Sequence, residues 1–353
     1  MKHLLRKVLY GLLGRGNSIL NKLVFSLQKN DNNVVVFNTA ISTDNLGDYI
    51  IMHYCQDVLD EIMKDAKFAD VSTHIVPSEE QGKIVKHSKY KFVCGTNLLT
   101  SHIEEWWNWR LPDGYKGKQD YRNIILLGVG WGTYQDKCSA YSKLIYRLLL
   151  NPCVLHSVRD QYTENKFKEI GIKNVINTGC PTMWNLTPQF CSSIPQKKAR
   201  DVVATITDYR QDKARDRIMF EILQRCYENI YVWIQGKRDE EYIRSLHLSD
   251  KVILIPRSLE AYESILTRGN IDYVGTRLHA GIYALNHKIR SIIIAVDNRA
   301  IEIAKDTNLP IVLRENIQNN LEEFIMSSFL TEIRINSENI NRFKRQFGLK
   351  NKQ

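Results

Sequence analysis

Val274-Gly275-Thr276-Arg277-Leu278-His279-Ala280-Gly281 is the stretch that decides the fold. An apolar run precedes it, Gly275 breaks that run, and a short-paced apolar segment, Ile282–Leu285, follows it. This pattern predicts a buried strand, a tight βα loop and the start of a helix. Because ligands of open α/β sheets bind at the carboxyl ends of the strands, the pattern predicts a binding loop here.

Two side chains of this loop carry chemistry. Arg277 has a planar, permanently charged fork that suits a carboxylate or a phosphate. His279 can hold or release a proton near neutral pH. A structural arginine beside a core histidine is the alternative interpretation, but the position directly after a strand favours a role at a ligand.

From residue 33 onward, the chain alternates between apolar strands and helical segments, which is typical of a parallel, doubly wound sheet. In the first half, strands are expected at 34–37, 68–74, 91–94, 124–127, 154–158 and 175–177, and helices at 50–62, 140–150 and 161–170. In the second half, strands are expected at 202–206, 230–234, 252–255, 271–274, 291–295 and 311–313, and helices at 212–228, 240–246, 259–267, 280–285 and 299–307.

The two α/β sets predict two Rossmann-like domains that face a central cleft. A proline- and serine-bearing stretch near Thr182–Arg200 interrupts the alternation and is interpreted as the linker. We therefore expect an N-terminal domain over residues 31–185 and a C-terminal domain over residues 200–335. Residues 1–30 are expected to form a basic amphipathic segment, and residues 336–353 a basic tail.

Composition limits the function classes. The chain has 353 residues, 43% of them hydrophobic, and a net charge of +10. Residues 1–30 account for +6 and residues 331–353 for +4, whereas nucleic-acid binders tend to spread basic residues over a folded face. The seven cysteines have no C-x-x-C spacing, so neither a disulfide framework nor a zinc site is expected, and the predicted location is the cytoplasm.

The N-terminal segment allows two interpretations. Leucine and valine recur at helical spacing from Leu4 to Leu13 and again from Ile19 to Leu27, with lysine and arginine between them and a break expected at Gly14-Arg15-Gly16. Such a segment can lie on the inner face of an anionic membrane. Equally, it can be a helix that packs on the protein's own core or on a partner.

Further loops at predicted strand ends supply candidate binding residues. Gly95 and Asn97 follow one strand and Gly130 follows another, and glycine lets backbone N–H groups approach an anion or a sugar closely. Arg159 ends a third strand, with an ion pair to Asp160 as its structural alternative. Tryptophans 106, 107 and 109 fit core packing better than a platform for a sugar or lipid.

These motifs occur in an order that resembles the polysaccharide pyruvyl transferase family. The resemblance rests on Asn45-Leu46-Gly47-Asp48, the glycine loops, Ser157–Asp160, and Gly275–Ala280 followed by a strand and Asp297. It covers residues 33–313 and implies a fold similar to two-domain, B-type glycosyltransferases. Family members transfer the pyruvyl group of phosphoenolpyruvate to a sugar, usually as a cyclic ketal. The chain departs from the family where Gly179-Cys180-Pro181 replaces Asp-Pro.

The resemblance also implies roles for individual residues. Arg277, His279 and Arg159 map to the residues that contact phosphoenolpyruvate, and His279 is the expected general acid. Asp48 or Asn45 is expected to orient or deprotonate the acceptor hydroxyl. The acceptor is a sugar of a cell-surface polysaccharide or its lipid-linked precursor, and no metal or cofactor is expected.

Two other functions remain open from the sequence. One is a glycosyltransferase of the same architecture that uses a nucleotide sugar, with Arg277 on the diphosphate. The other is a non-catalytic scaffold in polysaccharide assembly that is anchored by its N-terminus. The presence of both arginines and the histidine argues against the scaffold.

Overall fold

The computed structural model describes residues 2–28, 33–249 and 251–348. The chain forms two compact α/β units, which confirms the predicted fold class. Unit 1 comprises Met1–Thr43, Ile51–Pro181 and Asn336–Gln353, and unit 2 comprises Asp44–Ile50 and Thr182–Ile335. This division differs from the predicted domains, because residues 44–50, which include the first turn of a helix, belong with unit 2 and the last helix belongs with unit 1.

Unit 1 is built on a four-stranded parallel sheet in the order β2-β1-β3-β5. Its strands are β1 (Asn33–Asn38), β2 (Lys67–Ser72), β3 (Tyr90–Cys94) and β5 (Ile124–Leu127). Two short parallel pairs accompany the sheet, β4 (Asn97–Leu99) with β6 (Gly130–Trp131) and β7 (His156–Val158) with β8 (Val175–Asn177). The helices are α1 (Lys2–Leu27), α2 (Leu46–Ile62), α3 (Glu79–His87), α4 (Gly114–Gly117), α5 (Ala140–Leu149), α6 (Gln161–Glu169) and α14 (Ser337–Arg345).

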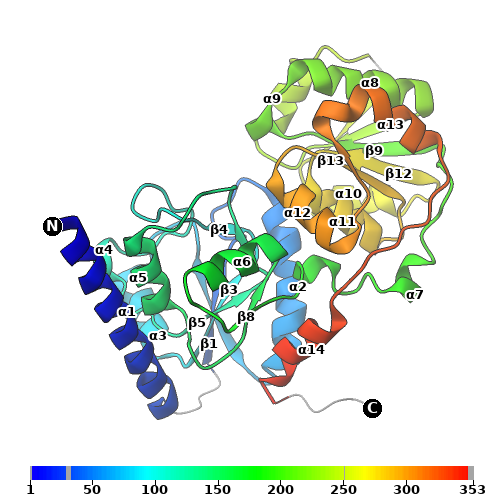
Figure 1. Ribbon diagram of the computed structural model, residues 1–353. Helices are drawn as coiled ribbons and strands as arrows, with labels where there is room; N and C mark the ends of the chain where they lie inside the picture. Colours follow the sequence, from blue (N-terminus) through cyan, green and yellow to red (C-terminus); the bar gives the residue numbers. More distant parts are fainter. Residues whose placement is uncertain (1, 29–32, 250, 349–353) are drawn as a thin grey trace. The chain divides into compact units, whose positions relative to one another are not determined.

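The core of unit 1 follows from the alternation of side chains along the strands. Val35 and Phe37 of β1 point to the same face as Leu126 of β5, where they pack with Ile145 and Leu148 of α5. The strands are buried on both faces, as parallel strands covered by helices are. Figure 1 shows α5 and α1 on one side of this sheet and α2 and α14 on the other.

Unit 2 contains a six-stranded parallel sheet in the order β11-β10-β9-β12-β13-β14. Its strands are β9 (Asp201–Thr205), β10 (Ile230–Trp233), β11 (Val252–Ile255), β12 (Ile271–Gly275), β13 (Ser291–Ala295) and β14 (Ile311–Leu313). Its helices are α7 (Pro188–Cys191), α8 (Lys213–Cys226), α9 (Asp239–Arg244), α10 (Leu259–Leu266), α11 (Leu278–Asn286), α12 (Asn298–Thr307) and α13 (Ile317–Met326). The strand order reverses between β9 and β12, and this reversal is where doubly wound sheets bind ligands.

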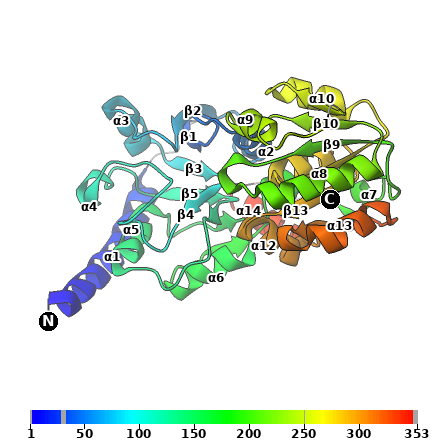
Figure 2. The ribbon, with the colours of Figure 1, turned by 90° about the horizontal axis from the view of Figure 1, so that it is seen from above.

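Helices cover both faces of the unit 2 sheet. Val202 and Ala204 of β9 pack with Leu223 of α8 and Leu321 of α13. Figure 2 shows α8 and α10 on opposite sides of β9 and β10. The carboxyl ends of β9 and β12 lie side by side, because Thr205 pairs with Gly275 in the parallel register.

Both ends of the chain differ from the sequence predictions. The break expected at Gly14–Gly16 was wrong, because α1 is one helix from Lys2 to Leu27. The tail expected from residue 336 contains α14, in which Ile340 and Phe343 are buried. Phe347, just beyond α14, contacts Phe92 of β3 with ring centroids 5.5 Å apart, and thus the segment is docked on unit 1.

Candidate active site

In unit 2, the loops that follow β9, β10 and β12 meet at the point where the strand order reverses. They line a cavity of about 530 Å³, which also receives Asn45 from the loop before α2. The polar lining includes Asn45, Asp208, Tyr209, Lys237, Arg238 and Arg277. Arg277 was predicted to lie in a binding site because it follows the end of a strand, and the cavity is at that end of β12.

Arg277 is buried and already paired with two carboxylates. Its side chain is 4% exposed, and its Nη2 donates to Asp208 Oδ1 at 3.1 Å and to Asp239 Oδ1. Its Nε donates to the Ile206 carbonyl at 3.2 Å. The guanidinium carbon lies 5.1 Å from the centre of the Tyr209 ring. These contacts fix the arginine at the edge of the cavity, since every one of them constrains the planar fork.

Asp239 joins the three loops. Its Oδ2 accepts from the Gly236 N–H at 2.7 Å, and its Oδ1 accepts from the Asp208 N–H at 3.1 Å. Burial raises the pKa of the Asp239 carboxyl, whereas Arg277 and the Gly236 N–H oppose that shift. Gly236 is needed for this packing, because a Cβ there would lie 2.5 Å from Arg277 Nη2.

Asn45 lies in the same cavity and anchors the start of α2. Its Oδ1 accepts from Gln235 Nε2 at 2.6 Å and from the Gly47 N–H at 3.1 Å. The helix begins at Leu46, and Asp48 is buried in its first turn. The Asn45 side chain occupies the capping position, because its oxygen accepts from the N–H of the second helical residue.

Lys237 and Arg238 are lining residues that the sequence reasoning missed. Both are exposed, and Arg238 Nε donates to Asp208 Oδ2 at 2.9 Å. The Lys237 N–H donates to the Asp44 carbonyl at 3.2 Å, which holds this loop against the Asn45 loop. Gly236-Lys237-Arg238 follows the predicted strand β10, so the signal that identified Arg277 could have found them as well.

His279 lies in the first turn of α11, directly after Arg277 and Leu278. It was expected in a loop with Arg277, but the helix starts at Leu278 and the His279 side chain is buried. Tyr273 holds this turn in place, because its hydroxyl donates to the Arg277 carbonyl at 2.7 Å. The residue is near Arg277 along the chain but does not line the 530 Å³ cavity as described over residues 33–249 and 251–348.

In unit 1, two predicted binding residues, Asn97 and Gly130, lie beside a third, Arg159. Its Nη1 donates to Asn97 Oδ1 at 2.8 Å, and its Nε donates to Asp160 Oδ2 at 3.2 Å. A Cβ at Gly130 would lie 2.2 Å from Arg159 Nη2, so a side chain there would displace the guanidinium. Within the described residues, this buried Nη2 has no hydrogen-bond partner. The ion pair with Asp160 was the structural alternative, and it is present.

Gly95 has a different role from the other glycines. It turns the chain after β3 with a φ of +56°, and a Cβ there would lie 2.0 Å from Cγ2 of Ile51 in α2. Close packing of α2 thus accounts for this glycine. Among the described residues, no group of three or more histidine, cysteine, aspartate or glutamate side chains is placed to hold a metal ion.

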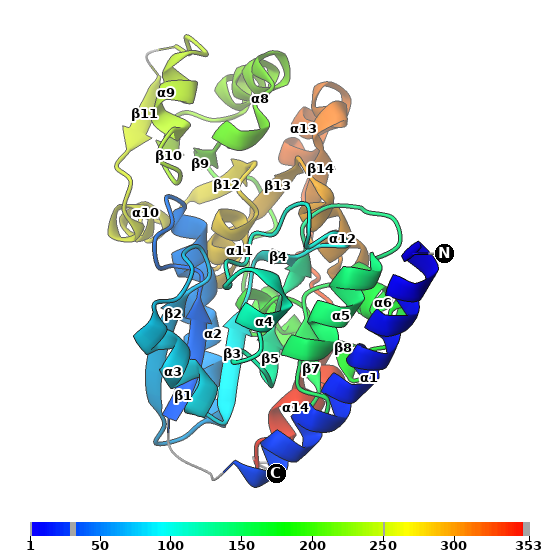
Figure 3. The same ribbon diagram turned by 90° about the vertical axis from the view of Figure 1, so that its left-hand side faces the viewer.

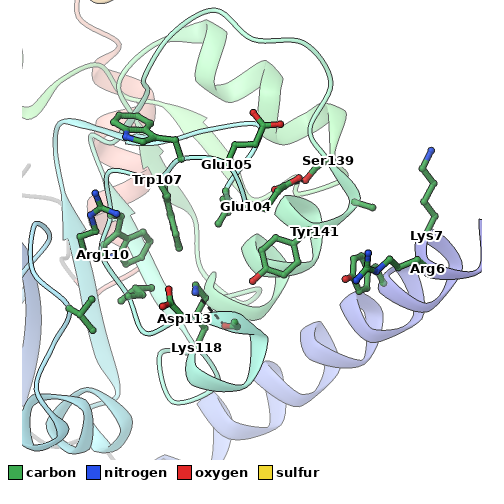
Figure 4. A pocket seen from close by; sticks show the side chains of 18 residues that line it. Arg6, Lys7, Glu104, Glu105, Trp107, Arg110, Asp113, Lys118, Ser139 and Tyr141 are labelled. Atoms are coloured by element: carbon green, nitrogen blue, oxygen red, sulfur yellow. Dashed lines mark hydrogen bonds between the residues drawn. The ribbon is translucent and has the colours of Figure 1, made fainter. Parts of the chain in front are cut away.

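A second cavity of about 860 Å³ lies in unit 1 (Figure 4). It is lined by Arg6 and Lys7 of α1 and by all three tryptophans at 106, 107 and 109. Trp107 and Trp109 are buried and thus belong to the core, as predicted, whereas Trp106 is 57% exposed. In Figure 4, Arg6 and Lys7 lie on the α1 side of the cavity, beyond Tyr141, and Trp107 and Arg110 lie on the opposite side.

One likeness among the solved structures agrees with the two-unit α/β architecture. UDP-GlcNAc 2-epimerase from Methanocaldococcus jannaschii, in complex with UDP-GlcNAc and UDP, has a TM-score of 0.51 and 13% sequence identity, covering 89% of this chain and 98% of that one. The apo lipopolysaccharide outer core galactosyltransferase WaaB has a TM-score of 0.46 and 11% identity, covering 83% of this chain and 90% of that one. At these identities the first likeness concerns the fold alone.

Sequence comparison is more specific. No curated protein matches the chain. The profile of the family described as polysaccharide pyruvyl transferase matches residues 45–298, a range that contains Asn45, both arginine sites and His279. The match spans well over half of the chain, and it agrees with the resemblance carried by the Asn45–Asp48 and Gly275–Ala280 motifs. The chain therefore belongs to the polysaccharide pyruvyl transferase family, and it is a transferase.

Proposed function

We propose that this transferase moves the pyruvyl group of phosphoenolpyruvate to a sugar of a cell-surface polysaccharide, such as a capsule or exopolysaccharide, or to its lipid-linked precursor. The reaction uses no metal or cofactor and takes place in the cytoplasm. The observation that carries the proposal is the group of cations Lys237, Arg238 and Arg277 around the cavity at the strand-order reversal of unit 2. Phosphoenolpyruvate has about three negative charges near pH 7, so its site needs more than one cation.

Arg277, Lys237 and Arg159 have different parts in the proposal. Arg277 is held by Asp208 and Asp239, which balance its charge. It therefore orients the donor through hydrogen bonds of fixed direction rather than attracting it as an unpaired cation. Lys237 is exposed and can move toward a phosphate as a compact charge. Arg159 of unit 1 is the further arginine that we assign to the donor, through its unpartnered Nη2.

Ketal formation needs a proton at the methylene carbon of the donor, which makes C2 electrophilic. We assign this proton to His279 as general acid. One sugar hydroxyl then attacks C2 and loses its proton, and the C2–O bond to phosphate breaks. The second hydroxyl closes the ring at C2, and its proton leaves with the phosphate. Asn45 or Asp48 orients the acceptor hydroxyl or takes its proton, and Gly95, Asn97 and Gly130 belong to loops assigned to substrate contact.

The test measures donor binding and turnover separately. Titration calorimetry with phosphoenolpyruvate is expected to show binding that Lys237→Ala weakens by about 1.5–3 kcal/mol, the scale of one charge-assisted hydrogen bond. Lys213→Ala, at an exposed lysine of α8 that does not line the cavity, is the matched control. Turnover is followed by phosphate release and by the mass of extracted lipid-linked glycans.

His279→Asn is expected to lower the single-turnover rate by ~10²–10⁴ while donor affinity changes much less. A variant that melts at a lower temperature and yet turns over normally per folded molecule would remove His279 from the mechanism. Binding of UDP without binding of phosphoenolpyruvate, together with nucleotide release from a nucleotide sugar, would replace the proposal with the glycosyltransferase alternative. Binding of neither donor would favour the scaffold.

A further inference from the structure

Helix α1 is attached to unit 1 by its polar side. The buried Asn21 donates through Nδ2 to the carbonyls of Leu148 at 2.9 Å and Leu150 at 3.3 Å. Arg122 Nη1 donates to Asn21 Oδ1 at 2.9 Å, and Tyr115 donates to Asn17 Oδ1 at 2.8 Å. Positions 10, 14, 17 and 21 repeat at helical spacing and thus form one docked face. Figure 3 shows α1 running along α5 at the edge of unit 1.

The apolar side of α1 is left exposed. Nine aliphatic side chains of the helix have 40–80% of their surface exposed, although residues of this kind are usually buried. They are Leu5, Val8, Leu9, Leu12, Leu13, Ile19, Leu20, Leu23 and Leu27. At 3.6 residues per turn, they fall within an arc of about 140° that excludes the docked face. An exposed apolar stripe of this length indicates an interaction surface.

The charge beside the stripe indicates which kind of surface it contacts. Residues 1–30 contain six lysines and arginines and no acidic residue. Arg15 and Lys22, both exposed, lie along one border of the stripe by the same helical geometry. Pairing two copies of the chain through this face would bring like charges together, whereas an anionic lipid surface complements both the apolar arc and its basic border.

We propose that the outward face of α1 binds the surface of an anionic lipid bilayer. The helix lies in the headgroup plane with its leucines in the acyl boundary and its polar face on unit 1. Among helices of the described residues, none is long and apolar enough to cross a membrane. The exposed leucines show that α1 does not pack its apolar side on the protein's own core. A partner protein and a lipid surface are the occupants that the test below separates.

Docking in this way also has a consequence for the 860 Å³ cavity of unit 1. Arg6 and Lys7 belong to α1 and line that cavity, so the bound helix brings the cavity to the headgroup layer (Figure 4). Resting on the proposed function, this position lets an acceptor sugar on a lipid carrier reach the protein without leaving the membrane. The membrane test below uses neither donor nor acceptor, and its result is therefore independent of the reaction.

The experiment is co-sedimentation of the full chain with phosphatidylcholine vesicles, with and without phosphatidylglycerol. We expect binding to the vesicles that contain phosphatidylglycerol and a loss of binding as salt is raised. Leu12→Glu and Leu23→Glu are each expected to weaken partition by about ten-fold or more, since each puts a charge where the proposal places a leucine in the acyl boundary. Ile253→Glu, at an exposed isoleucine of β11 in unit 2, is the matched control and should bind as the wild type does.

Arg15→Gln with Lys22→Gln should reduce binding to anionic vesicles and leave the melting temperature unchanged. Equal binding of the wild type and Leu12→Glu would overturn the proposal. So would a lack of binding to either vesicle. A concentration-dependent dimer by light scattering that Leu12→Glu converts to a monomer, without vesicle binding, would assign the face to a second copy of the chain.

Discussion

His156 is a buried histidine whose hydrogen bonds require it to be neutral. It lies in β7 of unit 1, where its Nδ1 accepts from the Leu126 N–H at 3.2 Å and its Nε2 lies 2.9 Å from the Asn151 carbonyl. Since Nδ1 accepts, the single proton is on Nε2, which donates to Asn151. A second proton would remove the acceptor for Leu126 and place a charge in the core of the unit. Burial accordingly lowers the pKa of His156 from 6.5 to about 4.

The size of this shift gives a pH dependence of stability. Below pH 6.5 the unfolded chain gains a proton at His156, whereas the folded chain gains it only near pH 4. The contribution to the free energy of unfolding is thus present in full above pH 6.5 and is lost as the pH falls through 4. A shift from 6.5 to about 4 corresponds to roughly 3 kcal/mol. That is a large part of the stability of an ordinary domain.

The assay is urea unfolding of the wild type and of His156→Asn at intervals from pH 7.5 to about pH 4. Asparagine can still accept from the Leu126 N–H but does not titrate, so the difference in unfolding free energy between the two proteins should shrink as the pH falls. His87→Asn, at an exposed histidine of α3, should keep the pH dependence of the wild type. Parallel loss of stability in the wild type and in His156→Asn over this range would refute the reasoning.

Two further predictions concern the buried arginines. Asp239→Asn should lower the free energy of unfolding by about 3 kcal/mol, because it removes one carboxylate from a buried pair. Glu240→Gln, at an exposed neighbouring position, should change the unfolding free energy measured in urea by no more than about 0.5 kcal/mol. Equal effects of the two substitutions would mean that the pair does not hold the loops together. Gly130→Ala should lower the free energy of unfolding by about 1–3 kcal/mol, because its Cβ would overlap the Arg159 guanidinium. Gly132→Ala should be tolerated, because its Cβ would have its nearest neighbour at 3.6 Å. Thermal unfolding of both variants would show the difference, and an unchanged melting temperature of Gly130→Ala would contradict the packing.

The strands could be predicted well because their signal is local. Ile124–Leu127 is four apolar residues in a row, and the observed β5 has the same bounds. The helix α14 was missed because its two buried residues, Ile340 and Phe343, stand among charged ones and gain their burial from unit 1. Similarly, the glycines of α1 suggested a break, but the buried amides of Asn17 and Asn21 lie on one face of an unbroken helix and hold it.

The sequence could predict those site residues that directly follow a strand. Arg277 and Arg159 were found because each follows an apolar strand, and Asn97 and Gly130 lie beside Arg159 because their loops follow neighbouring strands. The partner of Arg277 could not be identified in this way, because Asp239 is 38 residues away and no local pattern joins the two. That pairing changes the interpretation of Arg277. From the sequence it is a free cation, whereas in the structure its charge is balanced by Asp208 and Asp239.

The pairing also decides what kind of contribution each cation can make to binding an anion. Both buried arginines are braced in the same manner, by a carboxylate on the guanidinium and a glycine beneath it: Asp239 and Gly236 for Arg277, Asp160 and Gly130 for Arg159. Arg277 lies between two carboxylates, so it attracts a distant anion only weakly. It therefore contributes to donor binding mainly by hydrogen bonds of fixed orientation. The exposed Lys237 has no such restraint in the described loop and keeps its charge available. If the family reaction takes place here, the salt dependence of donor binding should therefore follow Lys237, while the orientation of the donor, and with it the rate, should follow Arg277.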